Sequence, residues 1–288
     1  MNDFEYLRPA TLADATAALA EHGPEARVLA GGTDLLVALR DGKAAPRAVI
    51  DIKRVADLHP GIEAHDDHVA IGARACMADV ADHAVVRTLF PALVEAARVV
   101  GSFQIRNRAT LAGNSCTASP AADTVPVLVA CGANLTIAGR GGRRVMPLVD
   151  FIRGNRQIAL ERGEMVAAVL LPKPAGSSGV AFERMTRRRG VDLATVNVCC
   201  AVDGVGVATF AFGAVAPKPF VVRDAGELAH PDTGAARRSA LMEALFAAAS
   251  PITDVRASAD YRRAMMHALA ERAFDRALGR RAAGGPHA

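Results

Sequence analysis

Two short segments of this sequence combine glycine with small polar residues in a way that suits the binding of a polar ligand. Residues 30–35 read A-G-G-T-D-L, and residues 108–126 contain T-L-A-G-N-S-C-T-A-S-P-A-A-D. Glycine permits close approach of a bulky group to the backbone, while asparagine, serine and threonine add side-chain donors and acceptors. Neither segment is rich in lysine or arginine, so both would hold a ligand through backbone amides and hydroxyl groups.

The first segment lies between a short apolar run, residues 27–30, and a second apolar run, residues 35–40. This order predicts a strand, a glycine turn and the start of a helix, an arrangement whose free amides bind phosphate. The sequence has neither the G-x-G-x-x-G fingerprint nor the lysine of a Walker A motif, which excludes a Rossmann or nucleoside-triphosphatase assignment. An ordinary tight turn at Gly31 and Gly32 is the alternative interpretation.

The second segment is unusually small and uncharged for a surface loop. Leu111 is its only bulky apolar residue before the apolar run 125–129. Asn114 tolerates left-handed backbone geometry, and Pro120 biases Ser119 towards an extended conformation. The segment is therefore interpreted as the wall of a crevice. The alternative is a tight buried crossover that needs small residues only for packing.

No other part of the sequence suggests a catalytic side chain or a metal centre. There is no Ser-His-Asp, Cys-His or paired-carboxylate arrangement, the eight histidines form no H-x-x-x-H or H-E-x-x-H pattern, and the five cysteines show no C-x-x-C spacing. We expect Cys116 to fill space in its loop and Cys199 and Cys200 to lie in a core. An odd number of cysteines without a secretory signal predicts reduced thiols in the cytoplasm.

Length and composition indicate a globular chain with two domains or one large one. Of 288 residues, 51% are hydrophobic and 22% are charged, which is enough for a sizeable core. The net charge of +4 comes largely from arginine, but the run Arg187, Arg188, Arg189 has no recognition motif beside it, which argues against nucleic-acid binding. We expect this run at a solvated or subunit-facing edge. No apolar run approaches the length of a membrane span.

Periodicity and turn residues predict α and β elements in both domains, separated by a linker at residues 173–179. Before the linker we expect helices at 12–22, 35–40, 77–83, 90–100 and 123–130, a helical turn at 55–58, and strands at 27–30, 48–52, 61–64, 68–71, 134–138, 143–146 and 165–171. After it we expect strands at 180–185, 194–202 and 205–212, followed by helices over much of 233–280. The predicted domains are 1–174, with subdomains of about 1–58 and 59–174, and 179–282.

The pair of glycine-containing segments resembles the FAD-binding subunits of molybdenum hydroxylases, a family that includes the flavin subunits of xanthine dehydrogenase and aerobic carbon monoxide dehydrogenase. The resemblance extends over the whole chain and includes Q-I-R-N at 104–107, the segments 182–194 and 211–219, and A-S-A-D-Y-R-R at 257–263. It is somewhat greater to the xanthine dehydrogenase branch. It implies an α+β fold: a two-part FAD-binding domain of the vanillyl-alcohol-oxidase type, followed by a smaller α+β C-terminal domain.

The resemblance also implies which residues contact FAD. The first clamp on the pyrophosphate would be Leu29, Ala30, Gly31, Gly32, Thr33, Asp34 and Leu35, and the second would be Thr110, Gly113, Asn114 and Thr117. Asp123 matches the acidic residue on the adenosine side; Gly101 and Val166 match positions near the flavin ring, and Arg184 matches a basic residue that reaches it. Two features depart from the family pattern. Ala112 replaces the first glycine of the usual T-x-G-G-N, and the four-cysteine insertion of some relatives is missing.

The function implied by the resemblance is that of an oxidoreductase subunit that relays electrons. Electrons would come from a molybdopterin-binding large subunit through a [2Fe–2S] small subunit to FAD on this chain, and would leave to NAD or quinone. Two alternatives stay open. A self-sufficient FAD oxidase is disfavoured by the scarcity of aromatic residues, with two tyrosines and no tryptophan. The other is a flavin-binding or assembly module with no turnover of its own.

Overall fold

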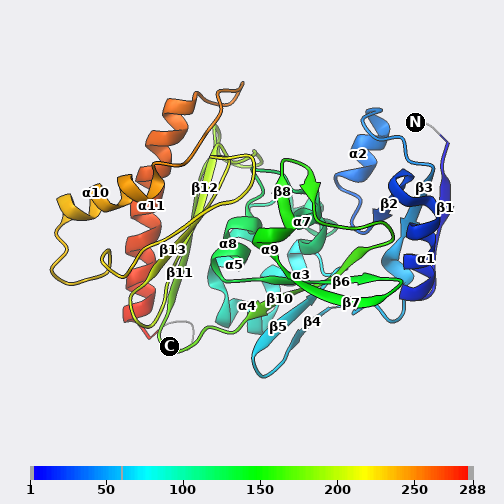
Figure 1. Ribbon diagram of the computed structural model, residues 1–288, viewed down its shortest axis with the longest axis horizontal. Coiled ribbons are helices and arrows are strands. Elements are labelled where there is room, and N and C mark those ends of the chain that lie inside the picture. The colour runs from blue at the N-terminus through cyan, green and yellow to red at the C-terminus, as the bar shows by residue number, and fades with distance from the viewer. Residues whose placement is uncertain (1–2, 60, 285–288) are drawn as a thin grey trace.

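The computed structural model describes residues 3–59 and 61–284, which form a small parallel sheet, a larger antiparallel sheet with helices, and a second α+β unit at the C-terminal end (Figure 1). The chain runs from the small sheet near the N-terminus, through the antiparallel sheet, to the long helix α11 at the opposite end of the molecule. Within the described residues, no helix combines the length and apolar character needed to cross a membrane.

The N-terminal part is a three-stranded parallel sheet in the order β1-β3-β2. Thr11 begins α1 as its N-cap, since its side chain accepts a hydrogen bond from the Asp14 amide. Helix α1 then buries Leu12, Ala15 and Leu19 along one side. The elements are β1 (Glu5–Leu7), α1 (Leu12–His22), β2 (Ala26–Leu29), α2 (Leu35–Arg40) and β3 (Ala48–Asp51), with short 3-10 turns at Gly23–Glu25 and Ile52–Arg54.

The middle part is a five-stranded antiparallel sheet in the order β4-β5-β10-β6-β7. Its strands are β4 (Ile62–Ala64), β5 (His68–Gly72), β6 (Asn134–Gly139), β7 (Gly142–Pro147) and β10 (Met165–Pro172), and a separate hairpin is formed by β8 (Ile152–Gly154) and β9 (Gln157–Ile158). Its helices are α3 (Met77–Asp82), α4 (Ala84–Leu89), α5 (Pro91–Arg98), α6 (Phe103–Arg106), α7 (Leu111–Thr117), α8 (Thr124–Ala130) and α9 (Leu148–Phe151). Arg74 joins this part to the first by donating to the Lys53 and Leu58 carbonyls at 2.9 and 2.8 Å.

The C-terminal part is a four-stranded antiparallel sheet in the order β11-β12-β13-β14, with two helices. Its elements are β11 (Gly179–Met185), β12 (Val196–Val202), β13 (Ala208–Gly213), β14 (Phe220–Arg223), α10 (Ala235–Phe246) and α11 (Ala259–Ala282). In Figure 1 this sheet stands between α11 on one side and α5 and α8 on the other.

Successive side chains of β12 point to opposite faces of this sheet, as they do in any strand, and so reach these two surroundings in turn. Val196, Val198 and Cys200 belong to the buried cluster that includes the α11 side chains. Cys199 belongs instead to the large core of the preceding parts. Both cysteines are fully buried, which confirms the expectation that they lie in a core.

Most of the predicted elements are present, but the segment 108–126 is not the loop that we expected. Residues 111–117 form helix α7, because Thr110 caps its first turn and the small buried residues Ala112 and Ser115 allow close packing. The helical turn predicted at 55–58 is also wrong: the 3-10 turn lies at Ile52–Arg54, where Asp51 accepts from the Lys53 amide. Elements that the sequence reasoning missed are β1, α4, α6, β8, β9, α9 and β14.

Candidate functional site

The two glycine-containing segments meet in the structure, 77 residues apart in the chain. A Cβ atom added to Gly31 would lie 1.9 Å from the backbone oxygen of Arg108 and 3.1 Å from the Ala109 Cα. Only glycine permits this approach. At the other end of the contact, the Thr117 hydroxyl donates to the Asp34 carboxylate at 3.4 Å. The two segments therefore lie side by side, which is the arrangement that the resemblance implies for a shared clamp.

The first segment presents a row of free amides between β2 and α2. Gly32 has φ of +81°, in the left-handed region that favours glycine. Within the part of the chain that the structure describes, the amides of residues 31–35 donate no hydrogen bond. The same residues are half-buried or exposed, so a ligand can reach these amides. Successive free amides at a turn of this kind attract anions such as phosphate.

The second segment offers the first turn of α7. The Thr110 hydroxyl oxygen accepts from the Gly113 amide at 3.0 Å, and a Cβ on Gly113 would lie only 2.7 Å from that oxygen. The Asn114 side-chain oxygen accepts from the Thr124 hydroxyl at 2.8 Å, which fixes the orientation of the asparagine amide. Ala112, the departure from the family pattern, lies within the helix and outside the positive-φ residues, so its methyl group causes no strain.

Replacing Thr110 with valine should weaken ligand binding at this site by freeing the first turn of α7. The substitution keeps the side-chain shape but removes the oxygen that accepts from Gly113, at a cost of about 1 kcal/mol. Ser258→Ala removes the comparable N-cap of α11, far from the site in the sequence, and is the matched control. Equal loss of affinity in the two variants for FAD, the ligand that the resemblance implies, measured by fluorescence titration, would contradict a specific role for Thr110.

Of the residues predicted near the flavin ring, Val166 lies on a strand that flanks α7, and Gly101 lies in the connection between α5 and α6. Gly101 has φ of +54°, and its carbonyl accepts from Arg106 at 3.1 Å. Val166 is 5% exposed and lies in β10, which packs against α7. Leu29, by contrast, is buried against Leu39 and Val49, so its observed contacts are those of a core residue.

Asp123, at the start of α8 in the middle part, and Arg184, in β11 of the C-terminal part, form a buried ion pair. Their closest oxygen and nitrogen atoms lie 2.6 Å apart, and Arg184 also donates to the Val99 and Asp192 carbonyls, both at 3.2 Å. Burial raises the pKa of Asp123 to about 6, although Arg184 and Asn197 both favour the charged carboxylate. The contacts predicted for this pair with the two ends of FAD stay predictions.

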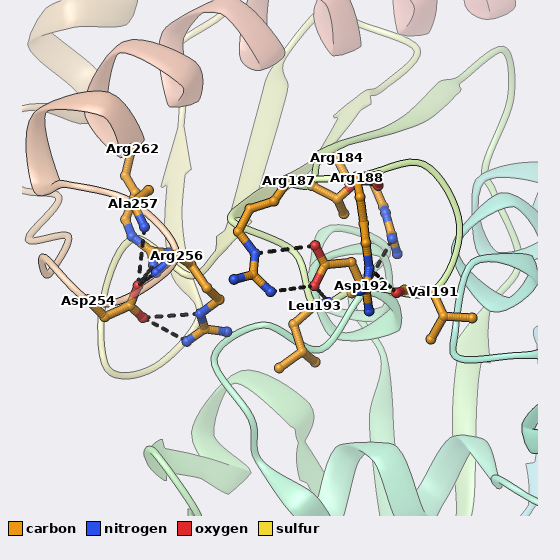
Figure 2. A network of polar contacts seen from close by, with 11 residues as sticks. Arg184, Arg187, Arg188, Val191, Asp192, Leu193, Asp254, Arg256, Ala257 and Arg262 are labelled. Atoms are coloured by element: carbon orange, nitrogen blue, oxygen red, sulfur yellow. Dashed lines mark hydrogen bonds and ion pairs between the residues drawn. The ribbon is translucent and has the colours of Figure 1, made fainter.

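Arg184 also belongs to the wider polar network drawn in Figure 2. There Arg187 pairs with Asp192 at 3.0 Å, and Arg188 donates to the Val191 carbonyl at 3.0 Å. All three arginines thereby hold one connection, residues 186–195, in a fixed conformation. Arg187 retains 48% of its side-chain exposure, in agreement with the solvated edge expected for this run.

Asn197 lies beside the Asp123–Arg184 ion pair and was not predicted from the sequence. It is fully buried and donates to the Asp123 carboxylate at 3.0 Å and to the Ala122 carbonyl at 3.2 Å. The sequence could have indicated it, because an asparagine is unusual in an apolar strand such as V-N-V-C-C. A buried asparagine side chain needs a hydrogen-bond partner. The identity of that partner required the structure.

Cys116 lies in α7, within the second segment, but offers no reactive thiolate. Burial raises the pKa of Cys116 to about 12, so its thiol stays protonated and unreactive, in line with a space-filling role. Within residues 3–59 and 61–284, no group of three or more histidine, cysteine or acidic side chains is arranged to hold a metal ion.

Comparisons with known proteins account for the chain from one end to the other. A family model described as "FAD binding domain in molybdopterin dehydrogenase" matches residues 2–174, and one described as "CO dehydrogenase flavoprotein C-terminal domain" matches residues 180–277. A solved structure of carbon monoxide dehydrogenase from Hydrogenophaga pseudoflava, which lacks the Mo-pyranopterin moiety, superimposes with a TM-score of 0.90 at 31% identity. That match covers 97% of this chain and 98% of the other.

Curated relatives come from both branches of the resemblance. The carbon monoxide dehydrogenase medium chain of Hydrogenophaga pseudoflava is 32% identical over 284 residues, covering 96% of this chain and 98% of the relative. The xanthine dehydrogenase FAD-binding subunit of Escherichia coli O157:H7 is 30% identical over 292 residues, covering 99% of each. These identities give no support to the sequence-based preference for the xanthine dehydrogenase branch.

Proposed function

Because the chain belongs to the family of FAD-binding subunits of molybdenum hydroxylases, we propose that it holds FAD between the Gly31 turn and helix α7 and relays electrons within a heteromeric complex. The observation that carries this proposal is the contact of Gly31 with the Arg108 backbone, which brings five free amides beside α7. FAD contains two negatively charged phosphates joined in a pyrophosphate. A row of free amides at the Gly31 turn suits that group.

The chemistry of the available donors fits FAD. The first segment supplies backbone amides, and the second supplies the Asn114 side-chain amide. These donors bind phosphate without needing a lysine row, and they keep the same charge in both redox states of a cofactor. The proposed contact residues are Leu29, Ala30, Gly31, Gly32, Thr33, Asp34, Leu35, Gly101, Thr110, Gly113, Asn114, Thr117, Asp123, Val166 and Arg184.

FAD supplies the redox chemistry when it is bound, and this chain contributes binding, orientation and exclusion of water. The free amides orient the pyrophosphate, and the buried strand β10 provides a dry wall. Arg184 brings a fixed positive charge, held by Asp123 and two carbonyls. We assign no catalytic side chain to this chain.

The proposed partners are a molybdopterin-binding large subunit and a [2Fe–2S] small subunit, with NAD or quinone as the electron acceptor. Support comes from the relatives, which are described as a medium chain and as an FAD-binding subunit of larger enzymes. Those descriptions favour a relay over a self-sufficient oxidase. The five free cysteines suit a cytoplasmic location.

A visible absorption spectrum of the purified full-length chain tests the proposal. We expect the two bands of oxidised flavin, and acid extraction should release FAD and not FMN. Anaerobic titration with NADH then distinguishes the acceptors, since bleaching identifies a nicotinamide and an unchanged spectrum favours quinone. A colourless chain that fails to bind added FAD would refute the flavoprotein assignment.

A further inference from the structure

The connection between α7 and α8 is held by the C-terminal part of the chain. The Ala214 amide donates to the Pro120 carbonyl at 2.7 Å, and Asn197 donates to the Ala122 carbonyl at 3.2 Å. The same Asn197 amide group donates to the Asp123 carboxylate at 3.0 Å. Three anchor points, at Pro120, Ala122 and Asp123, are therefore held by β12 and by the residue after β13.

This connection leads directly to a proposed FAD contact. Asp123 is followed by Thr124, whose hydroxyl donates to the Asn114 side-chain oxygen at 2.8 Å. Asn114 lies in the first turn of α7, next to Gly113 and its hydrogen bond with Thr110. A shift at Asp123 therefore moves the group that orients the Asn114 amide.

The surroundings of Asn197 are built for this one residue. A Cβ on Gly213 would lie 2.2 Å from the Asn197 side-chain oxygen and 2.7 Å from the Pro120 carbonyl, so Gly213 provides the room for both groups. The Asn197 oxygen is buried and accepts no hydrogen bond within the described residues, an arrangement that costs stability. An apolar residue would avoid that cost but would take a donor away from the Ala122 carbonyl and the buried Asp123 carboxylate, so the amide is retained for the contacts it makes with this connection.

We propose that Asn197 is a positioning residue through which the C-terminal part sets the geometry of the second FAD clamp. The inference rests on the proposed FAD site and goes beyond it, because Asn197 is not one of the proposed contact residues and acts through its hydrogen bond to one of them, Asp123. Its action runs through Asp123 and Thr124 to Asn114. FAD affinity then depends on the C-terminal part even where that part does not contact the cofactor.

Two substitutions at position 197 separate positioning from general stability. Asn197→Ala removes both donated hydrogen bonds, and we expect the Kd for FAD to rise roughly tenfold. Asn197→Asp keeps the shape but places a second carboxylate against Asp123, with Arg184 as the cation in contact with the pair. At pH 8 this variant should bind FAD more weakly than Asn197→Ala, and between pH 8 and 5.5 it should recover as the two carboxylates share a proton.

The pH profile is specific because the charged surroundings of position 197 are simple. Asp123 faces it from the N-cap of α8 and Arg184 from β11, while Arg262 contacts the carbonyl of Thr195 two residues earlier in the chain. The Kd for FAD of each variant should be compared with that of the wild type at the same pH. On this scale FAD affinity should recover in acid for Asn197→Asp and not for Asn197→Ala. Gly213→Ala, which displaces the Asn197 oxygen without removing it, should weaken FAD binding at all pH values.

Val198→Ala is the matched control. Val198 is the next residue in β12, is equally buried, and faces the α11 cluster instead of the connection. It should lower the Tm of the full-length chain and leave the Kd for FAD unchanged. Unchanged FAD affinity in Asn197→Ala, Asn197→Asp and Gly213→Ala, or equal weakening in Val198→Ala, would overturn the inference while leaving FAD binding by the wild type intact. A wild type that binds no FAD would overturn the proposed function and this inference together.

Discussion

Replacing Gly31 with alanine is expected to abolish FAD binding by the full-length chain. The new methyl group would lie 1.9 Å from the Arg108 carbonyl oxygen and 2.7 Å from the carbonyl carbon. Because both are backbone atoms, movement of a side chain cannot relieve this clash. The two clamp segments must then separate, and the donors can no longer reach one pyrophosphate together. We expect the Kd to rise by at least about a hundredfold, since a misplaced site loses several hydrogen bonds at once.

Gly141→Ala provides the control for this change. Gly141 lies in the turn between β6 and β7, its φ is not positive, and an added Cβ would meet no atom within 4 Å. Both variants should be compared by fluorescence titration with FAD and by circular dichroism. A folded Gly31→Ala protein that binds FAD like the wild type would show that the close approach of the segments is irrelevant to the cofactor.

Replacing Asp254 with alanine should destabilise the C-terminal part by about 3–5 kcal/mol, the range seen when one partner of a buried ion pair is removed. Arg262 is 1% exposed, and its guanidinium pairs with Asp254 at 2.7 Å. Without Asp254, its positive charge would be buried with only the Thr195 and Ala214 carbonyls as acceptors. Figure 2 shows Asp254 between Arg262 and Arg256, so one carboxylate serves two cations.

The destabilisation caused by Asp254→Ala should also depend on pH. Desolvation opposes ionisation of Asp254, but hydrogen bonds from Arg256 and Arg262 outweigh it and lower the pKa of the folded state. The stabilisation is therefore complete above the unfolded pKa, about 4, and is lost as the pH falls through the lower folded value. Urea unfolding of the wild type and Asp254→Ala should give free energies that differ at pH 7 and converge below pH 4.

Asp232→Ala is the corresponding control, because Asp232 is 93% exposed and lies 3.7 Å from His230. It should change the free energy of unfolding by less than about 0.5 kcal/mol. A comparable effect of the two substitutions would mean that the Arg262 network adds no specific stability.

The order of strands and helices was predictable because local patterns determine it. The helix at residues 12–22 has a threonine cap and a regular apolar stripe, and it appears within its predicted bounds. Helix α7 was not predicted, because T-L-A-G-N-S-C-T has poor helix formers and no apolar period of its own. Its helical state depends on the Thr110 cap and on packing against α8 and β10, both set by the tertiary structure.

The pairing of the two glycine segments was predictable in outline, whereas its geometry was not. Gly31 is needed because of the Arg108 backbone, and nothing in the local sequence at either position reveals that contact. Likewise, Asp123 and Arg184 were predicted as separate cofactor contacts, and the structure adds that they bind each other. Long-range contacts of this kind depend on how whole elements pack.

The two faces of strand β12 have a consequence for how the molecule unfolds. Cys199, with its neighbours Phe182 and Ala211, is part of the core that lies mainly before the linker, although all three residues come after it. Separation at residues 173–178 would expose this apolar surface and leave the Asp123 and Arg184 charges without their partners. The two segments matched by the family models therefore share one hydrophobic core. Heat or denaturant should unfold both in a single transition, with equal calorimetric and van't Hoff enthalpies.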